Sequence, residues 1–352
     1  MNRRIVTIAV GLTAAGLLAG CGGSGGGDKP SVFSSSAKSG DSKNGDSKSD
    51  KAAAPIITAA QAAKVLDAYQ TVNNAANKTQ DGAKLGAVED GALFQQSSAQ
   101  YKQFPEFTAK TKAAYTQPFL YGGRQFYIPA TGSWFMVSAS PTGGNYPKDE
   151  HQLIVFKRQS GGNWKMVVAD NYTGTLPALA KGPDGAPVVV GSDTTVGGTK
   201  LSALGTAVND LRVTGGKKTG AALADTAVRR ATVKEYTTRN DDWGKYKGCL
   251  RTDYEDAGTK WDSAYIKYPD TYALKTADGG ALVAGTSYYV ELDFSTRPDQ
   301  CSVVPGGTTT AYLHGDQTGV RNRYASLNVI SVPAAGKPAQ LGGDVQLIGA
   351  SS

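Results

Sequence analysis

The spacing of apolar residues predicts that the folded part of the chain begins with helices. Thr58 and Gln61 fit the two ends of a capping box, and Pro55 just upstream favours a non-helical approach. Apolar residues then recur at three- and four-residue steps, which predicts an amphipathic helix that runs to about Lys78. A second helical stretch, weaker because two glycines interrupt it, covers about residues 83–102.

The period then changes from that of helices to that of strands. Aromatic and β-branched residues at 125–128 and 133–139 flank a turn that contains Pro and Gly, which predicts a hairpin. Residues 151–158 and 163–170 form a second predicted hairpin around a Gln-Ser-Gly-Gly turn. Helices followed by a meander of antiparallel strands indicate the α+β class.

The same order recurs in the second half of the chain. Residues 201–211 and 221–236 have helical spacing, and residues 288–294 then alternate strictly between apolar and polar faces. Residues 325–329 alternate too, and 345–348 are a candidate last strand. The correspondence between the halves is architectural, since few residues are identical.

This repetition predicts two tandem domains, each with N-terminal helices packed on a curved antiparallel sheet. We place them at residues 55–190 and 200–352, with the division near 183–200. Domains of about 140 to 150 residues are well suited to single hydrophobic cores.

The N-terminus has the pattern of a signal peptide. Arg3 and Arg4 precede a 16-residue uncharged run that ends in small residues at Gly20. The run is shorter than the roughly 20 apolar residues that a membrane-spanning helix needs, and it leads into glycines. We therefore expect residues 1–20 to be cleaved rather than retained as a span.

Leu18-Ala19-Gly20-Cys21 resembles the lipobox of bacterial lipoproteins. The resemblance implies cleavage before Cys21, whose thiol receives a diacylglycerol, and two or three acyl chains anchor a protein stably. It predicts a lipoprotein held at the extracytoplasmic face of the cell membrane, with the membrane as a partner. The alternative is an ordinary signal peptide with an incidental cysteine.

Residues 21–54 have the composition of a disordered tether. After Cys21 they are mostly Gly, Ser, Lys, Asp and Ala, with Phe33 the single aromatic, and such a segment buries too little apolar area to fold. A flexible coil of this length has an end-to-end distance of about 30 Å. We expect it to hold the folded part clear of the lipid headgroups.

Net charge argues against a nucleic-acid partner. The whole chain carries a formal +7, but the signal peptide and the tether account for three of these charges, which leaves about +4 on residues 55–352. No cluster of Lys and Arg is longer than the pairs Lys217-Lys218 and Arg229-Arg230. The sequence predicts no nucleic-acid binding.

Cysteine usage agrees with export. Besides Cys21 the chain has Cys249 and Cys301, and an even pair in an extracytoplasmic protein favours a disulfide. The alternative is two reduced thiols, one of them buried.

The first predicted domain resembles the cystatin-like cone of the nuclear-transport-factor-2-like superfamily. The resemblance lies in the helical start, the strands that follow, and Trp164-Lys165-Met166 after a polar Gly-containing turn near the end of the sheet. It covers most of residues 55–180 and, more faintly, 201–349. Together with the lipobox, the tether and the Ala, Gly and Thr content, the chain resembles an uncharacterised family of actinobacterial lipoproteins with tandem cone domains.

That resemblance implies a pocket between helix and concave sheet, in which some members of the superfamily are enzymes with a buried acid or base. Here no Asp, His or Tyr matches a catalytic motif. The candidates to line such a pocket, which are equally typical of a plain core, are Tyr69, Tyr121, Tyr127, Trp134 and Phe135.

Metal-site signatures are absent from the sequence. The two histidines, His151 and His314, are isolated from one another, and there is no HExxH, EF-hand or CxxC pattern. We predict no metal site and no cofactor.

Two hypotheses of function follow. The first is a non-catalytic lipoprotein that binds a protein, a glycan or a small apolar molecule. The second is an isomerase- or cyclase-like enzyme acting on a small ligand in one cone. The lack of a matched acid or base favours the first, and the sequence assigns no ligand-binding residues.

Overall fold

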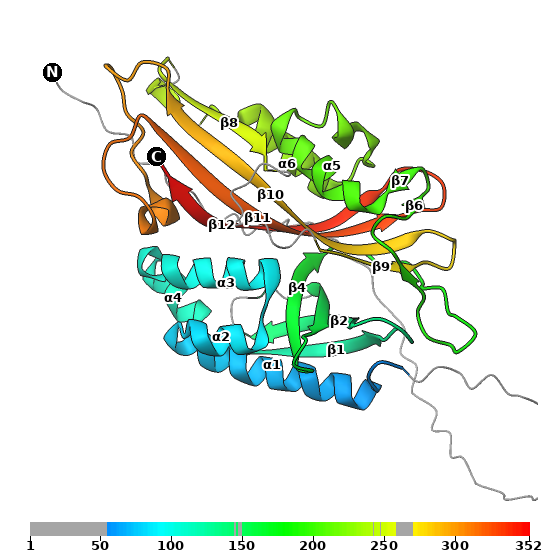
Figure 1. The fold of residues 1–352 in the computed structure, drawn as a ribbon. Coiled ribbons are helices and arrows are strands. Elements are labelled where there is room, and N and C mark those ends of the chain that lie inside the picture. Colours follow the sequence, from blue (N-terminus) through cyan, green and yellow to red (C-terminus); the bar gives the residue numbers. More distant parts are fainter. Residues whose placement is uncertain (1–54, 144–145, 147–149, 242, 247, 258–269) are drawn as a thin grey trace, which may run out of the picture. The chain divides into compact units, whose positions relative to one another are not determined.

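Figure 1 shows the fold of the protein in a computed structural model. The described residues all belong to one compact unit of the chain. The predicted signal peptide, the predicted tether and Cys21 lie outside them. The structure describes residues 55–143, 146, 150–241, 243–246, 248–257 and 270–352.

Four helices open the described chain. The Thr58 side chain accepts the Gln61 N–H while the Gln61 side chain accepts the Thr58 N–H, so the predicted capping box is confirmed. The first helix ends at Thr79, close to the predicted end, because Gln80 takes a left-handed conformation. The helices are α1 (Ala59–Thr79), α2 (Gly82–Val88), α3 (Gly91–Gln103) and α4 (Ala109–Tyr115), with the 3₁₀ turn η1 (Phe104–Glu106) before α4.

The stretch predicted as one helix over 83–102 is two helices. Helix α2 ends at Val88, and Asp90 then caps α3 with its carboxylate, which accepts the Gly91 N–H at 2.9 Å. Gly91 has a φ of 64°, a conformation that favours glycine and breaks a continuous helix. The interrupting glycine is therefore part of a helix boundary rather than a weak point within one helix.

Both hairpins predicted in the first half are present. They form an antiparallel four-stranded sheet in the order β1-β2-β3-β4, with a register shift between Gly122 and Gln125. Its strands are β1 (Phe119–Tyr127), β2 (Trp134–Gly143), β3 (His151–Arg158) and β4 (Trp164–Tyr172).

The second half forms a larger antiparallel sheet with two helices. Strand β10 is its centre: it pairs with β11 on one side and with both β8 and β9 on the other, while β12 and β5 lie beyond β11 and β9. The elements of the sheet are β5 (Val189–Val190), β8 (Leu250–Asp256), β9 (Thr271–Lys275), β10 (Ala281–Ser295), β11 (Gly319–Val332) and β12 (Ala339–Ser351). The other elements are a short hairpin, β6 (Thr195–Val196) with β7 (Thr199–Lys200), the helices α5 (Leu204–Val213) and α6 (Ala227–Thr238), and the 3₁₀ turns η2 (Leu201–Ala203), η3 (Thr219–Ala222), η4 (Gly244–Tyr246) and η5 (Gly307–Ala311).

The two sheets share one hydrophobic cluster. Side chains of β2 and β3 belong to the same buried cluster as Leu282, Leu327 and Val329 of the larger sheet. The backbones also meet, because the Thr173 N–H donates to the Leu341 carbonyl at 3.0 Å. The mixed α and β architecture agrees with the predicted class, while the division into two domains stays a prediction.

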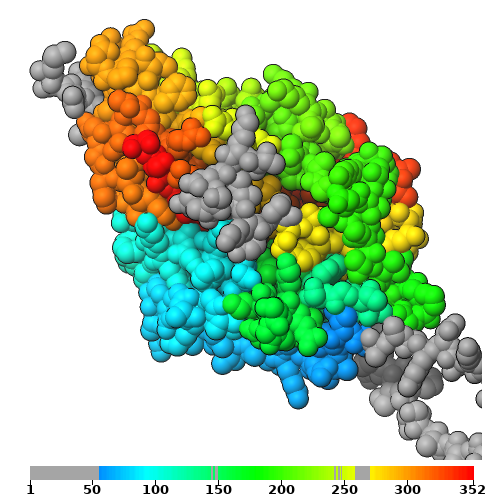
Figure 2. All heavy atoms as spheres, in the orientation of Figure 1, coloured from blue at the N-terminus to red at the C-terminus, as the bar shows by residue number. Residues whose placement is uncertain are grey.

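Helix α3 packs against β11 and β12 of the larger sheet. The Gln103 side chain donates to the Leu347 carbonyl at 2.6 Å and to the Tyr312 hydroxyl at 3.0 Å. Gln96 donates to the Ala325 carbonyl at 3.0 Å. The space-filling view shows the cyan surface near residue 100 against the orange surface near residue 310 (Figure 2).

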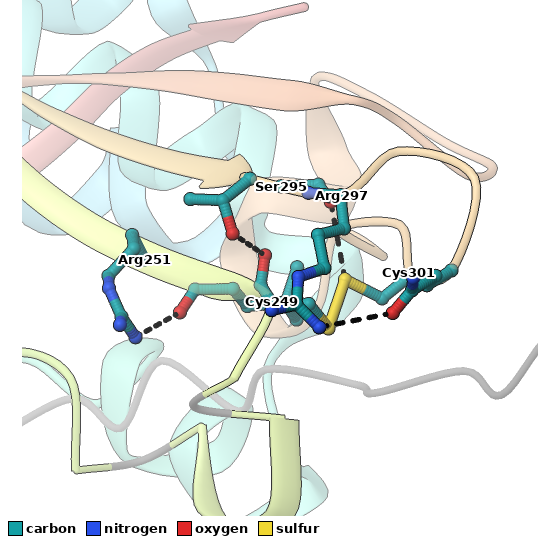
Figure 3. The surroundings of a disulfide bond; sticks show 8 residues. Cys249, Arg251, Ser295, Arg297 and Cys301 are labelled. Atoms are coloured by element: carbon teal, nitrogen blue, oxygen red, sulfur yellow. Dashed lines mark hydrogen bonds between the residues drawn. A yellow bond between two sulfur atoms is a disulfide. The ribbon is translucent and has the colours of Figure 1, made fainter.

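Cys249 and Cys301 form the predicted disulfide, with Cα atoms 6.4 Å apart. It joins the start of β8 to the segment that follows β10 (Figure 3). The Ser295 hydroxyl lies 3.2 Å from the Cys301 sulfur and accepts the Arg297 N–H at 3.1 Å. No helix among the described residues combines the length and the apolar content that crossing a membrane requires.

Candidate functional site

An apolar pocket of about 210 Å³ lies between α1, the end of α2 and the strands β3 and β4. We call it the α1 pocket. Its lining is apolar apart from one tyrosine hydroxyl and one indole N–H. The lining residues are Val65, Ala68, Tyr69, Val88, Phe156 and Trp164.

Aromatic contacts fix the positions of the Tyr69, Phe156 and Trp164 rings that line the α1 pocket. The ring of Phe135 stacks on Phe156 with centroids 5.2 Å apart, and it meets Trp164 edge-on at 5.0 Å. Tyr69 meets Phe156 edge-on at 6.0 Å. Such edge-on and stacked pairs have preferred geometries, so they fix the shape of the wall.

The hydroxyl of Tyr69 belongs to a buried polar triad with Asn73 and Glu89. It donates to Glu89 Oε1 at 2.7 Å, and Asn73 Nδ2 donates to the same oxygen at 3.0 Å. Glu89 is only 1% exposed. A carboxylate this deeply buried is costly unless it is hydrogen-bonded, and here the Tyr69 and Asn73 donors both reach Oε1.

Burial dominates the ionisation of this triad. It raises the pKa of Glu89 from its ordinary 4.5 to about 7, although the hydrogen bonds from Tyr69, Ser97 and Asn73 act in the opposite direction. Burial also raises the pKa of Tyr69, and the adjacent Glu89 carboxylate adds to that shift. A proton is therefore exchangeable at Glu89 near neutral pH, directly behind the pocket wall.

Glu89 lies in the break between α2 and α3, which positions its side chain beside Tyr69 and Asn73. Its N–H closes α2 on the Leu85 carbonyl, and its backbone then pairs in parallel with Met166 of β4. The following residue, Asp90, donates its N–H to the Met166 carbonyl at 3.0 Å. The sequence analysis did not identify Glu89, and the signal that would have found it is the Asp-Gly helix boundary immediately after it.

Of the five aromatic candidates, the structure brings only Tyr69 to the α1 pocket. Phe135 is fully buried beneath it, and Tyr121 is buried with its hydroxyl on the Gln152 side chain at 2.8 Å. Trp134 packs edge-on against Tyr272 at 5.4 Å. Tyr127 is half-buried in the same cluster, so the core interpretation holds for most of this set.

The histidines take no part in a metal cluster among the described residues. His151 Nδ1 lies 3.0 Å from the Ser140 hydroxyl, and its ring stacks on Tyr172. In the part of the chain that the structure describes, no group of three or more His, Cys, Asp or Glu side chains is arranged to hold a metal ion.

A second buried polar cluster lies on the larger sheet. The Asn322 amide donates to Glu291 at 3.1 Å and to Asp293 at 3.2 Å, and the Thr252 hydroxyl donates to Asp293 at 2.6 Å. Burial and the neighbouring Glu291 carboxylate raise the pKa of Asp293. Because these hydrogen bonds join β8, β10 and β11 to one another, this cluster holds the sheet together.

Sequence comparison gives the family. Residues 53–352 match the family described as a domain of unknown function (DUF8094), and the chain belongs to that family. The chain is also 31% identical over 298 residues to an uncharacterized lipoprotein of Streptomyces coelicolor, an alignment that covers 82% of this chain and 80% of the relative. No solved structure matches the chain.

Proposed function

We propose that this protein is a membrane-anchored lipoprotein whose folded body binds a small apolar ligand in the α1 pocket without catalysing a reaction. The relative in Streptomyces is a lipoprotein, which supports anchoring through a lipid on Cys21. In this proposal the folded body lies at the extracytoplasmic face of the cell membrane, at the end of the tether of residues 21–54.

The apolar lining of the α1 pocket carries the proposal. Its volume of about 210 Å³ exceeds the roughly 150 Å³ of an apolar protein cavity that takes up benzene. Of the two polar side-chain groups among its lining residues, the Tyr69 hydroxyl is already engaged with Glu89, and the other is the indole N–H of Trp164. A ligand that needs no hydrogen bonds therefore suits this pocket better than a polar one does.

Toluene is a suitable probe for the test. We expect it to raise the melting temperature of the wild-type protein in a saturable way, since a ligand that binds only the folded state stabilises it. Ala68→Trp places an indole in the pocket and should abolish the effect. The matched control is Ala113→Trp on the exposed surface of α4, which should respond like wild type.

The same rise in melting temperature in Ala68→Trp and in wild type would show that toluene binds elsewhere. The absence of any rise in wild type would contradict the proposal. A competition series with larger rings then gives the size limit of the pocket.

The enzyme hypothesis has one observation in its favour, which is the buried Glu89 carboxyl group, whose pKa is raised to about 7 and which accepts a hydrogen bond from Tyr69. A group that exchanges its proton near neutral pH is suited to general acid and base catalysis. The test is the exchange of α-hydrogens of cyclohexanone for deuterium, followed by NMR. Exchange that wild type accelerates and Tyr69→Phe does not would favour an isomerase-like enzyme over a binding module.

We also propose that the two halves are tandem cystatin-like cones. In each half the helices precede the antiparallel sheet, apart from the two-residue strand β5 of the larger sheet, which precedes α5, and this is the order that the resemblance implies. Separate expression of residues 55–190 and 200–352 tests this division. Two cooperatively folding fragments would support it, and two unfolded fragments would favour a single folding unit built on the shared cluster.

A further inference from the structure

Strand β1 is an edge of the four-stranded sheet, and side chains close its first half. Asn74 donates to the Phe119 carbonyl at 2.8 Å and accepts the Phe119 N–H at 3.1 Å, as a neighbouring strand would. Gln70 accepts the Tyr121 N–H, and Arg124 Nε donates to the Tyr121 carbonyl at 2.8 Å. Natural sheets often blunt their edges, because a free edge is a template for pairing with another chain.

The second half of the same edge is not closed in this way. The backbone N–H and carbonyl of Tyr121, which lies opposite Pro141, point away from β2. The backbone N–H and carbonyl groups of alternate β2 residues, from Pro141 back to Val137, therefore point toward β3. Phe126 pairs with Val137 beyond the register shift, and its N–H and carbonyl therefore point away from the sheet. Among the described residues outside the sheet, none makes a hydrogen bond to the backbone of Phe126.

A pocket of about 280 Å³ adjoins this open half of the edge. We call it the edge pocket. It is distinct from the α1 pocket, since the two have no lining residue in common. Its lining includes Phe126 of β1 and Ile128, which follows the strand, and the exposed carboxylate of Asp184 supplies its charge. Its remaining lining residues are Pro55, Ala59, Ala130, Gly185, Ala186 and Pro187.

We propose that an extended segment of a partner protein adds to this edge as a strand at Phe126. The segment places an apolar side chain in the edge pocket and a basic side chain beside Asp184. Strand addition takes its affinity from main-chain hydrogen bonds and its selectivity from pockets for alternate side chains. The outward N–H and carbonyl of Phe126 are suited to pairing with an extended polypeptide. The Asp184 carboxylate at the pocket favours a basic side chain on that polypeptide.

The test uses the full-length protein in detergent and a fluorescein-labelled heptapeptide in which threonine alternates with valine and leucine between terminal lysines. A second peptide with the same sequence carries N-methyl groups on alternate amides, so that one of its edges cannot donate hydrogen bonds. We expect saturable binding of the first peptide, measured by fluorescence anisotropy, and at least about tenfold weaker binding of the second.

Two variants and a matched control complete the design. Phe126→Pro removes the outward N–H and the aromatic side chain, and Ala59→Trp fills the edge pocket from α1. Each substitution should lower the affinity for the first peptide by about tenfold or more. Leu120→Ser alters a 62% exposed side chain in the closed half of the same strand and should leave the affinity unchanged.

Equal affinity for the two peptides, or no saturation at about 1 mM, would overturn the proposal. So would binding that survives in both Phe126→Pro and Ala59→Trp. Saturable binding of decanol that Ala59→Trp abolishes, without peptide binding, would assign the edge pocket to an alkyl chain instead. Self-association of the wild-type protein that Phe126→Pro abolishes, without peptide binding, would assign the edge to a second copy of this chain.

Discussion

Replacing Glu89 by glutamine should reduce the pH dependence of stability. The pKa of Glu89 in the folded protein is about 7, above its ordinary 4.5, so the folded state holds this proton more tightly than the unfolded chain does. The resulting stabilisation is fully present below pH 4.5 and is lost as the pH rises through 7. The difference of 2.5 pKa units corresponds to about 3 kcal/mol, since Glu89 is almost completely buried.

The assay is urea denaturation of wild type and Glu89→Gln at pH 4.5 and pH 8, followed by tryptophan fluorescence. Other buried carboxyl groups titrate equally in both proteins, so the difference between the two pH dependences isolates Glu89. Between pH 4.5 and pH 8 the free energy of unfolding of wild type should fall by about 3 kcal/mol more than that of the variant. Glu106→Gln, at an exposed position in η1, is the control and should follow wild type. Parallel curves for wild type and Glu89→Gln would refute the reasoning.

Three further predictions concern stability and are measured by denaturation. Gly342→Ala should cost about 3 kcal/mol or more, because its Cβ would lie 1.7 Å from the Asn171 carbonyl oxygen, and a stability like that of wild type would contradict this contact. Replacing Cys249 and Cys301 by serine together should cost about 4 kcal/mol, from the entropy of a loop closed over a separation of 52 residues. Thr58→Ala should cost about 1 kcal/mol by removing the cap of α1, and an unchanged midpoint would show that the cap is dispensable.

The sequence predicted those features of the fold whose contacts lie within one helix or one hairpin. The capping box at Thr58 predicts the start of α1 because its hydrogen bonds lie within four residues. The hairpins of the first sheet were equally predictable, since their turns and alternating residues are adjacent in the chain. The disulfide followed from the compartment and the number of cysteines rather than from any contact.

Contacts between distant segments left weaker signals. Strand β8 was not predicted, because the buried face of Leu250–Asp256 includes Thr252, whose burial is compensated by hydrogen bonds with Trp243 and Asp293. Glu89 was missed for the same reason, since its partners Tyr69 and Asn73 come from another helix. A pattern of apolar positions cannot indicate a polar residue that is buried beside its hydrogen-bond donors.

The shared cluster between the two sheets has a similar origin. Leu327 alternates with polar residues in its strand and Phe156 lies in an apolar run, so each is predicted as core, but the pattern does not say against which sheet it packs. Packing across sheets depends on complementary surfaces formed by residues far apart in the sequence. The sequence therefore predicts which faces are buried more readily than it predicts what covers them.

The central claim is that Cys21 carries a lipid that holds this protein at the membrane. Mass spectrometry of the N-terminal peptide, taken from protein extracted from membranes of the native host, tests this claim most directly. The account predicts a chain that begins at Cys21 and bears a diacylglycerol on its sulfur. A mature chain that begins at Met1, or a Cys21 without acyl groups, would contradict it.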